Sequence, residues 1–291
     1  MSENVITSYK GFDKNMECRG FKYEVGKEYE MDGEIKCCNR GFHACKSPIE
    51  VWDYYDMLNS RFAEVEQSGK IDEEEKSTKI CSSRIKIKAE LKLADIINIG
   101  VEWLKDITSP SKIKEDGVLN DNGYRRKQIG SSGDYAKIGS SGDSAQIGSS
   151  GNSAKIGSSG DSAQIGSSGD YAQIGSSGNS AKIGSSGNSA KIGSSGDYAK
   201  IGSSGNSAKI GSSGDYAQID STGEDSVIMC AGNESKAKAK VGSWITLAEW
   251  KWSDEKNRNV PVCVKTEYVD GENIKADTWY QLKNGKFEVN E

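Results

Sequence analysis

The sequence predicts a mainly β protein with an α+β N-terminal domain, a central β-solenoid (a parallel β-roll) of nine-residue repeats, and an antiparallel β tail. A nine-residue phrase, first met as IGSSGDYAK from Ile129, returns ten times as far as Gln218. Within each copy, Ala and the next Ile lie two residues apart, which places both on one face of a strand. The flanking segments carry apolar and aromatic residues in ordinary core-forming patterns.

A flexible Gly/Ser linker is the alternative interpretation of the repeat. A linker does not need Ile at one fixed phase, so the pattern favours a folded solenoid. Ala-Lys-Ile is then a short strand with Ala and Ile inward and Lys or Gln outward, and Gly-Ser-Ser-Gly-Asp forms the turn. Nine residues cannot enclose a core, so we expect two repeats per coil. Ten copies then make about five coils over about 24 Å at the spacing of neighbouring strands.

Two repeats per coil place odd and even copies on opposite faces. Odd copies carry Lys137, Lys155, Lys191 and Lys209 against Asp134 and Asp170. Even copies carry Lys182 and Lys200 against Asp143, Asp161, Asp197 and Asp215. The array is neutral in total, with six Lys and six Asp. We therefore expect one face with a net charge of about +2 and the other of about −2 at neutral pH.

Residues 1–118 are expected to form the small α+β domain. FKYEVGKEYEMDGEIKCC contains an Asp-Gly turn signal and predicts a hairpin. Ser47 before Pro48 predicts a helix start over IEVWDYYDML, with the Ser hydroxyl as its cap. RFAEVEQ and RIKIKAELKL alternate at period two and predict paired strands around the acidic DEEEK loop. LADIINIGVEWLKDI has helical spacing.

Residues 119–241 are assigned to the solenoid, because IDSTGEDSV and IMCAGNESK continue the nine-residue step in degenerate form. Residues 242–291 contain an Asp-Gly and an Asn-Gly turn between alternating apolar residues, so we expect antiparallel β structure. Solenoid ends expose strand edges that need caps, and the flanking domains are the natural caps.

Composition and charge exclude several classes of protein. The formal net charge is −5, which does not favour nucleic-acid binding. No leader and no apolar run of membrane-spanning length is present, which predicts a cytoplasmic protein without membrane contact. Seven Cys without a signal peptide are expected to be reduced thiols. Ladders of Thr for ice binding and dense negative charge for DNA mimicry are absent.

Candidate binding residues occupy the outward positions of the solenoid. Exposed aromatic rings beside cations can stack a nucleotide or a single strand, and the alternative is aromatic cover on an exposed sheet. These residues are Tyr135, Lys137, Lys155, Tyr171, Lys191, Tyr198, Lys200, Lys209 and Tyr216. The GSSGD phrase partly resembles the calcium-binding nonapeptide of RTX rolls, but Asn replaces Asp in four copies. We therefore expect Asp134 and its equivalents to form hydrogen-bonded Asx turns and no calcium site.

The CCNRGFHAC segment holds the candidate metal and thiol residues. Cys37, Cys38, His43 and Cys45 are residue types that bind zinc, although their spacing matches no standard pair of pairs. Buried thiols are the interpretation that the spacing favours. His43 is the only His of the chain, so a Cys–His nucleophilic pair would need it together with Cys18 or Cys81. No cofactor is expected.

The flanks resemble an uncharacterised domain family of phage and prophage proteins. The resemblance lies in KGFDKNMECRGFKYEVGKEYE, GFHACKSPIEVWDYY, SRFAEVEQSGKI and STKICSSRIKIKAEL, and in a closing GSWITLAEW and VDGENIKADTWYQLKNGKF. It covers most of residues 8–95 and 242–289 and implies origin on a mobile element. SAKIG also resembles phrases in the β-roll heads of trimeric bacterial adhesins, which implies that the roll can oligomerise.

We therefore expect a non-enzymatic accessory protein of phage type that acts by binding. The favoured interpretation is an inhibitor of a host enzyme or defence system in the host bacterial cytoplasm, with a host protein as partner. The first alternative is a structural phage component in which the roll is a rod or a homo-oligomerisation element. The second is a thiol or zinc enzyme centred on Cys37, Cys38, His43 and Cys45.

Overall fold

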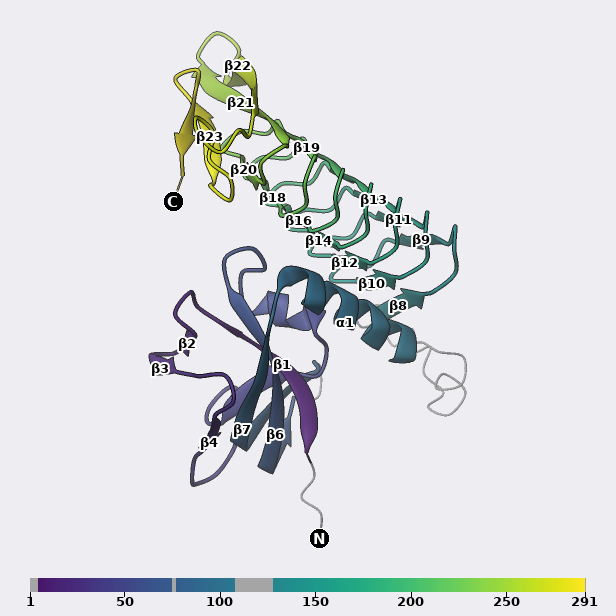
Figure 1. The fold of residues 1–291 in the computed structure, drawn as a ribbon, viewed down its shortest axis with the longest axis vertical. Coiled ribbons are helices and arrows are strands. Elements are labelled where there is room, and N and C mark those ends of the chain that lie inside the picture. The colour runs from purple at the N-terminus through teal and green to yellow at the C-terminus, as the bar shows by residue number, and fades with distance from the viewer. Residues whose placement is uncertain (1–4, 75–76, 108–127, 291) are drawn as a thin grey trace. The chain divides into compact units, whose positions relative to one another are not determined.

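The structure, a computed structural model, describes residues 5–74, 77–107 and 128–290. The chain divides into two compact units, Met1–Trp103 and Leu104–Glu291 (Figure 1). The architecture is mostly β, with an α+β region first and a β-solenoid after it, as predicted. The solenoid has about seven turns over residues 128–247. No helix of the described residues is long and apolar enough to cross a membrane.

The N-terminal unit is built on a five-stranded antiparallel sheet in the order β4-β7-β5-β1-β6. Its strands are β1 (Ile6–Phe12), β4 (Glu28–Glu30), β5 (Phe42–Cys45), β6 (Arg61–Glu73) and β7 (Lys79–Leu91). The predicted pairing of β6 with β7 is confirmed, with Phe62 opposite Leu91. Since β6 pairs with both β1 and β7, the strands β7, β5, β1 and β6 close on themselves around an apolar core.

The predicted hairpin over FKYEVGKEYEMDGEIKCC is wrong. The short strand β3 (Phe21–Lys22) pairs backwards with β2 (Glu17–Cys18), and β4 pairs with β7 more than fifty residues along the chain. Local turn signals cannot reveal this, because β4 finds its partner through tertiary packing.

Both predicted helices of this unit are present, one of them in a shorter form. η1 is a 3₁₀ helix over Ile49–Asp53 whose N-cap is Pro48, and no side chain caps it, so the cap role predicted for Ser47 is wrong. α1 spans Leu93–Ile107. An added Cβ at Gly100 of α1 would collide with Ile49, which indicates close packing of α1 on η1.

The solenoid contains two parallel sheets that alternate along the chain, which confirms two repeats per coil. Each strand pairs with the strand eighteen residues on, as in Ile147 with Ile165. One sheet contains β8 (Gln128–Ser131), β10 (Gln146–Ser149), β12 (Gln164–Ser167), β14 (Lys182–Ser185), β16 (Lys200–Ser203), β18 (Gln218–Ser221) and β20 (Lys236–Ala239). The other contains β9 (Lys137–Ser140), β11 (Lys155–Ser158), β13 (Gln173–Ser176), β15 (Lys191–Ser194), β17 (Lys209–Ser212), β19 (Val227–Cys230) and β21 (Trp244–Ser253).

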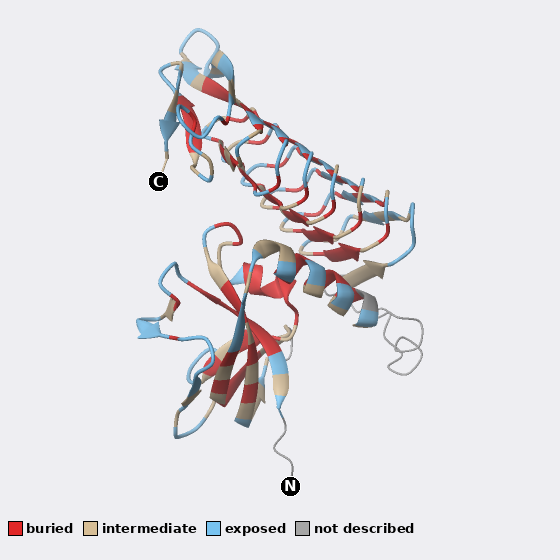
Figure 2. Cartoon of the chain, viewed as in Figure 1, coloured by how far each residue is buried: buried red, intermediate tan, exposed pale blue. Residues whose placement is uncertain are grey.

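Each strand is Lys/Gln-Ile-Gly-Ser in most repeats, not Ala-Lys-Ile, so the first Gly and first Ser belong to the strand and not to the turn. The Ile and Ala columns are buried and form one apolar core. Buried residues are drawn in red along the coils in Figure 2. The turn is Ser-Gly-Asx-Ser/Tyr, whose last residue has a positive φ near +56° in most copies, as at Ser162. The coils exceed the predicted five because the degenerate copies continue the ladder.

The antiparallel C-terminal segment caps the solenoid, as predicted for this end. β22 (Arg258–Tyr268) pairs with β21, and the hairpin β23 (Tyr280–Lys283) and β24 (Lys286–Val289) joins β20. Val269, Ile274, Tyr280 and Leu282 extend the solenoid core. Asn284 and Gly285 both have positive φ, which fits the predicted Asn-Gly hairpin turn. Capping of the first coil by the N-terminal domain stays a prediction.

Candidate functional sites

The solenoid separates its lysines by sheet, as the odd–even rule predicts. Lys137, Lys155, Lys191 and Lys209 begin strands of the sheet that contains β9, and their side chains are exposed. Lys182 and Lys200 begin strands of the sheet that contains β8. The two sets of lysines therefore lie on different sheets.

The expectation of one positive and one negative face is wrong, because the carboxylates do not lie on the sheets. Asp143 and Asp161 occupy the turns that follow the sheet with β9, and Asp134 and Asp170 occupy the turns at the opposite edge. Each strand ends at the first Ser of the repeat, and the Asx residue follows the second Gly, so it lies in the turn and not on the strand. The solenoid thus has cationic faces and acidic edges.

The Asx side chains form ladders between coils and not local Asx turns. Asp161 Oδ1 accepts the backbone N–H of Asn179 at 2.7 Å, and Asn179 Oδ1 accepts that of Asp197 at 2.9 Å. An amide oxygen makes this bond as well as a carboxylate does, which explains why Asn and Asp interchange. No group of metal-ligating side chains is found among the described residues of the solenoid.

The four candidate tyrosines lie in the turns, at the positions of positive φ. Tyr198 and Tyr216 stack at one edge with ring centroids 4.9 Å apart and planes 4° apart. Tyr135 and Tyr171 belong to the other edge, where Ser153 separates them by one coil. The tyrosines therefore lie on the edges of the solenoid and the lysines on its faces. Sequence reasoning placed both on one outward surface because it did not distinguish strand positions from turn positions.

A pocket of about 1100 Å³ opens in the N-terminal unit. Its aromatic wall consists of Phe21, Tyr23 and Tyr29, which meet edge to face at centroid distances of 4.8–5.3 Å. Phe21 is 47% exposed and Arg19 stands beside it with a positive φ of 52°. The pocket also carries the acidic residues Asp13, Glu17, Glu28, Glu30 and Asp56.

Lys10 is a buried cation beside this pocket. Its Nζ donates to the carbonyl oxygen of His43 at 3.0 Å and to Cys18 Sγ at 3.6 Å. It also lies over the rings of Phe12 and Tyr23 at 5.5 and 5.6 Å. Burial lowers the pKa of Lys10, although the neighbouring Cys18 opposes the shift. The rings and the carbonyl oxygen replace water around the ammonium group.

Cys18 joins this cluster through a hydrogen bond of 2.9 Å with the hydroxyl of Tyr55. The pKa of Tyr55 is raised by burial and by this contact, so its hydroxyl keeps its proton. Lys10 lies on β1, Cys18 ends β2, and Tyr55 lies in the segment after η1. Sequence reasoning missed the cluster because Tyr55 is 37 residues from Cys18 and no local spacing connects the three residues.

The imidazole of His43 is held by the backbone. Nε2 accepts the N–H of Cys38 at 3.0 Å, and a hydrogen bond to Gly41 acts to raise the pKa of the ring. Burial outweighs that bond and lowers the pKa of His43, with Lys10 acting in the same direction. The imidazole is therefore neutral at pH 7 and braces the Cys37–Cys38 turn.

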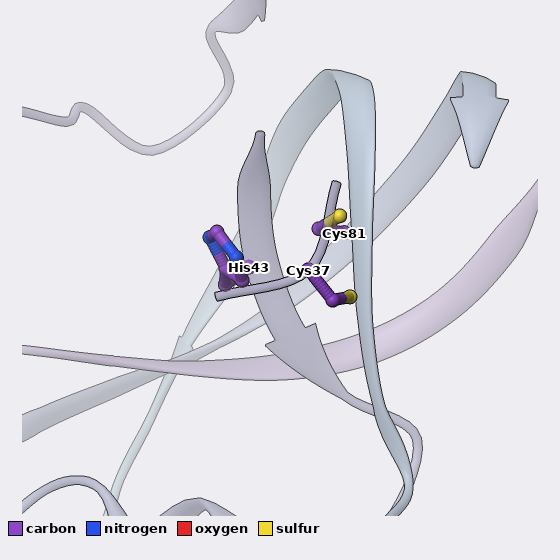
Figure 3. Close-up of side chains that lie close together, drawn as sticks. All are labelled: Cys37, His43 and Cys81. Atoms are coloured by element: carbon purple, nitrogen blue, oxygen red, sulfur yellow. The ribbon is translucent and has the colours of Figure 1, made fainter. Parts of the chain in front are cut away.

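The structure groups His43 with Cys37 and Cys81, whose ligand atoms lie within 4.8 Å of one another (Figure 3). Of the predicted zinc set Cys37, Cys38, His43 and Cys45, it therefore brings together two members and adds Cys81. Cys38 Sγ instead receives a hydrogen bond from Lys79 Nζ at 3.0 Å, and Cys45 is buried. Burial raises the pKa of Cys37 and Cys45, and that of Cys81 to about 12, so all three are thiols at neutral pH.

Comparison with known proteins adds one finding. A family model described as "Domain of unknown function (DUF7666)" matches residues 6–99, which is most of the N-terminal unit. The resemblance of the N-terminal flank to an uncharacterised domain is thus supported. Comparisons with curated proteins and with solved structures gave no match.

Proposed function

We propose that the protein is a non-enzymatic accessory protein of phage type that binds a host protein through the pocket of its N-terminal unit. In this proposal it inhibits a host enzyme or defence system in the bacterial cytoplasm. The observation that carries the proposal is the pocket itself, with the aromatic wall Phe21, Tyr23 and Tyr29 and the neighbouring Arg19.

The lining supports a protein partner. Aromatic side chains and Arg are the residue types that dominate binding energy at protein–protein interfaces. Cations and carboxylates occur together around the pocket, whereas a site for a polyanion carries cations alone. A half-exposed Phe21 held by two tyrosine rings is a rigid anchor that loses little entropy on binding.

The engagement of the nucleophilic groups supports a binding role over catalysis. A general base needs a free nitrogen, and Nε2 of His43 already accepts the backbone N–H of Cys38. A thiolate is the reactive form of Cys, and burial keeps Cys37 and Cys81 protonated. These observations favour a binding role over a thiol enzyme.

Capture of host proteins on the full chain tests the proposal. Arg19→Asn together with Phe21→Ala removes the anchor while an αL-compatible residue keeps the turn. Lys27→Ala, on the same unit but outside the pocket, is the matched control. We expect a partner whose activity falls on binding to be retained by the wild type and by the control and lost by the double variant. Equal retention of the partner by all three proteins would exclude the pocket as its binding site.

The structural-component alternative rests on the solenoid. Seven coils at about 4.8 Å each give a stiff element about 34 Å long, which suits a rod or an oligomerisation element. Mass spectrometry of purified virions separates the two functions, because a virion component is present in particles and an inhibitor is absent from them.

A further inference from the structure

The sheet that contains β9, together with the turn that follows each of its strands, repeats one line of four outward residues in each coil. Counting from the first strand residue, positions 1, 3, 5 and 7 are Lys or Gln, Gly, Ser, and Asp or Asn, as in Lys155, Gly157, Ser159 and Asp161. The strand pairing stacks these positions into columns. We name two of them. The Lys stripe is Lys137, Lys155, Gln173, Lys191 and Lys209. The Asp stripe is Asp143, Asp161, Asn179, Asp197 and Asp215.

The two stripes have the same order of charges. Both carry a charge in coils one, two, four and five and a neutral amide in coil three, where Gln173 and Asn179 stand. The other sheet and its edge show no such match, since Lys182 and Lys200 are followed by Asn188 and Asn206. The matching order is therefore a property of one face and the edge that adjoins it.

The two stripes do not neutralise each other within one chain. Asp161 lies six positions after Lys155, in the turn beyond the strand, at most about 20 Å away along the chain. Within the described residues, no ion pair involves a lysine of the Lys stripe. Like charges at the spacing of neighbouring strands destabilise a sheet, so each stripe gains from an opposite charge supplied from outside.

Between the stripes runs a column of glycines without side-chain neighbours. A Cβ added at Gly139, Gly157, Gly175, Gly193 or Gly211 would meet nothing within 4 Å. The column forms the floor of an open groove of about 790 Å³ that the lysines border. Glycine in a strand costs about 0.5–1 kcal/mol relative to Ala, and packing within the chain does not explain that cost here. A second surface that approaches closely does explain it.

We propose that this face is the interface of a parallel homodimer. Rotation by 180° about an axis that runs along the solenoid, between the Gly and Ser columns, carries each stripe onto the other at the same coil height. Lys155 then faces the partner's Asp161, Gln173 faces the partner's Asn179, and each Ser faces a partner's Gly. The interface is isologous, because the contact of the first residue with the second is repeated by the second with the first.

The charge order selects this orientation over the antiparallel one. A two-fold axis parallel to the strands would turn the partner end for end and place the Lys stripe on the partner's Lys stripe and the Asp stripe on the partner's Asp stripe. Facing stripes of like charge repel each other. The Gly and Ser columns between the Lys stripe and the Asp stripe carry no charge that would offset this repulsion.

The same face ends in an apolar patch that extends the interface. Val227 and Trp244 continue the column of the Lys stripe, and Tyr268 pairs with Trp244. Val227, Met229 and Trp244 are 51%, 54% and 47% exposed. Seven coils of about 4.8 Å and a width of up to about 20 Å give up to about 670 Å² per protomer, which reaches the range of stable dimers. This surface belongs to the second unit, so the inference does not depend on the proposed pocket.

Sedimentation of the full chain tests the dimer. We expect a dimer whose dissociation constant rises with salt. The double variant Lys155→Glu with Lys191→Glu places two new carboxylates opposite the partner's Asp161 and Asp197. We expect this repulsion to weaken dimerisation at least tenfold. Asp161→Asn with Asp197→Asn keeps the oxygen that holds the neighbouring coil and is expected to weaken it less strongly. Asp134→Asn with Asp170→Asn makes the same chemical change at the opposite edge and is expected to leave it unchanged.

Two results overturn the proposal: a wild-type chain that stays monomeric at about 100 μM, where a micromolar dimer would form, or equal behaviour of the two Asp→Asn pairs. Gly157→Leu with Gly193→Leu supplies a second route, because both side chains enter open space in the monomer and obstruct the partner's Ser column. Orientation is read from carbodiimide cross-links in a mixture of ¹⁴N and ¹⁵N chains. Mixed-isotope links between Lys191 and Asp197 support the parallel dimer, and mixed links between N- and C-terminal coils alone exclude it.

Discussion

The carboxylate of Asp170 accepts the backbone N–H of Asn188, eighteen residues further along the chain, at 2.7 Å. The bond joins one coil to the next at the edge of the solenoid. Each turn of the described array repeats it with Asp or Asn, so an edge side chain replaces part of the hydrogen bonding that strands provide on the faces.

Two substitutions of Asp170 distinguish the contribution of its acceptor oxygen to stability from that of its negative charge. Asp170→Ala leaves the N–H of Asn188 to water and is expected to lower the free energy of unfolding by about 0.5–1.5 kcal/mol. Asp170→Asn retains the acceptor and is expected to leave it unchanged. Urea unfolding of the two variants beside the wild type measures both. A loss as large for Asn as for Ala would assign the effect to charge instead.

The two glycines of a repeat have different reasons to be glycine. A Cβ at Gly169 would overlap the carbonyl oxygen of Gly151 in the preceding coil, whereas a Cβ at Gly157 meets open space. Gly169→Ala is therefore expected to destabilise the solenoid by about 1–3 kcal/mol, the range for overpacked sites. Gly157→Ala is expected to be neutral or to stabilise by up to about 1 kcal/mol. Thermal unfolding followed by circular dichroism ranks the pair, and the reverse ranking would contradict the coil stacking.

Truncation of an Ile side chain in the solenoid should lower the free energy of unfolding as truncation in a hydrophobic core does. Ile183 is fully buried between the sheets. Ile183→Ala is expected to cost about 2–5 kcal/mol and Ile183→Val about 0.5–1.5 kcal/mol, because a cavity adds to the lost transfer energy. Urea unfolding of both variants measures the two costs. The loose coil of a Gly/Ser linker would show no loss for either.

The repeat could be predicted from the sequence because its information is local and periodic. The fixed phase of Ala145 and Ile147 reveals an inward face, and nine residues are too few for a coil, so eighteen follow. The partner of Asp161 could not be predicted in this way, since it becomes a neighbour only after the coil closes. The same reason hid the cluster of Lys10, Cys18 and Tyr55, which three separate elements bring together. Chemistry that depends on tertiary proximity leaves no spacing to find.

Asp270 gives a prediction in which pH is the variable. Its carboxylate accepts the side-chain amide of Asn273 at 2.7 Å and the backbone N–H groups of Glu272, Asn273 and Ile274 at 2.8–3.0 Å. The Asn273 side chain first, and then these N–H groups, lower the pKa of Asp270 to about 2. A folded-state pKa below that of the unfolded chain means stability that is present above the unfolded pKa of about 4 and lost as pH falls through the folded value.

We therefore expect the difference in unfolding free energy between the wild type and Asp270→Asn to be constant from about pH 5 to pH 8 and to shrink between about pH 4 and pH 2. Asn retains one acceptor oxygen, so the loop keeps its bonds to the backbone, while its amide cannot accept from Asn273. Urea unfolding at a series of pH values measures the difference. Asp254→Asn, an exposed acid in the β21–β22 turn, is the control for general acid sensitivity. A difference that stayed level down to pH 2 would mean that Asp270 does not hold this loop through its charge.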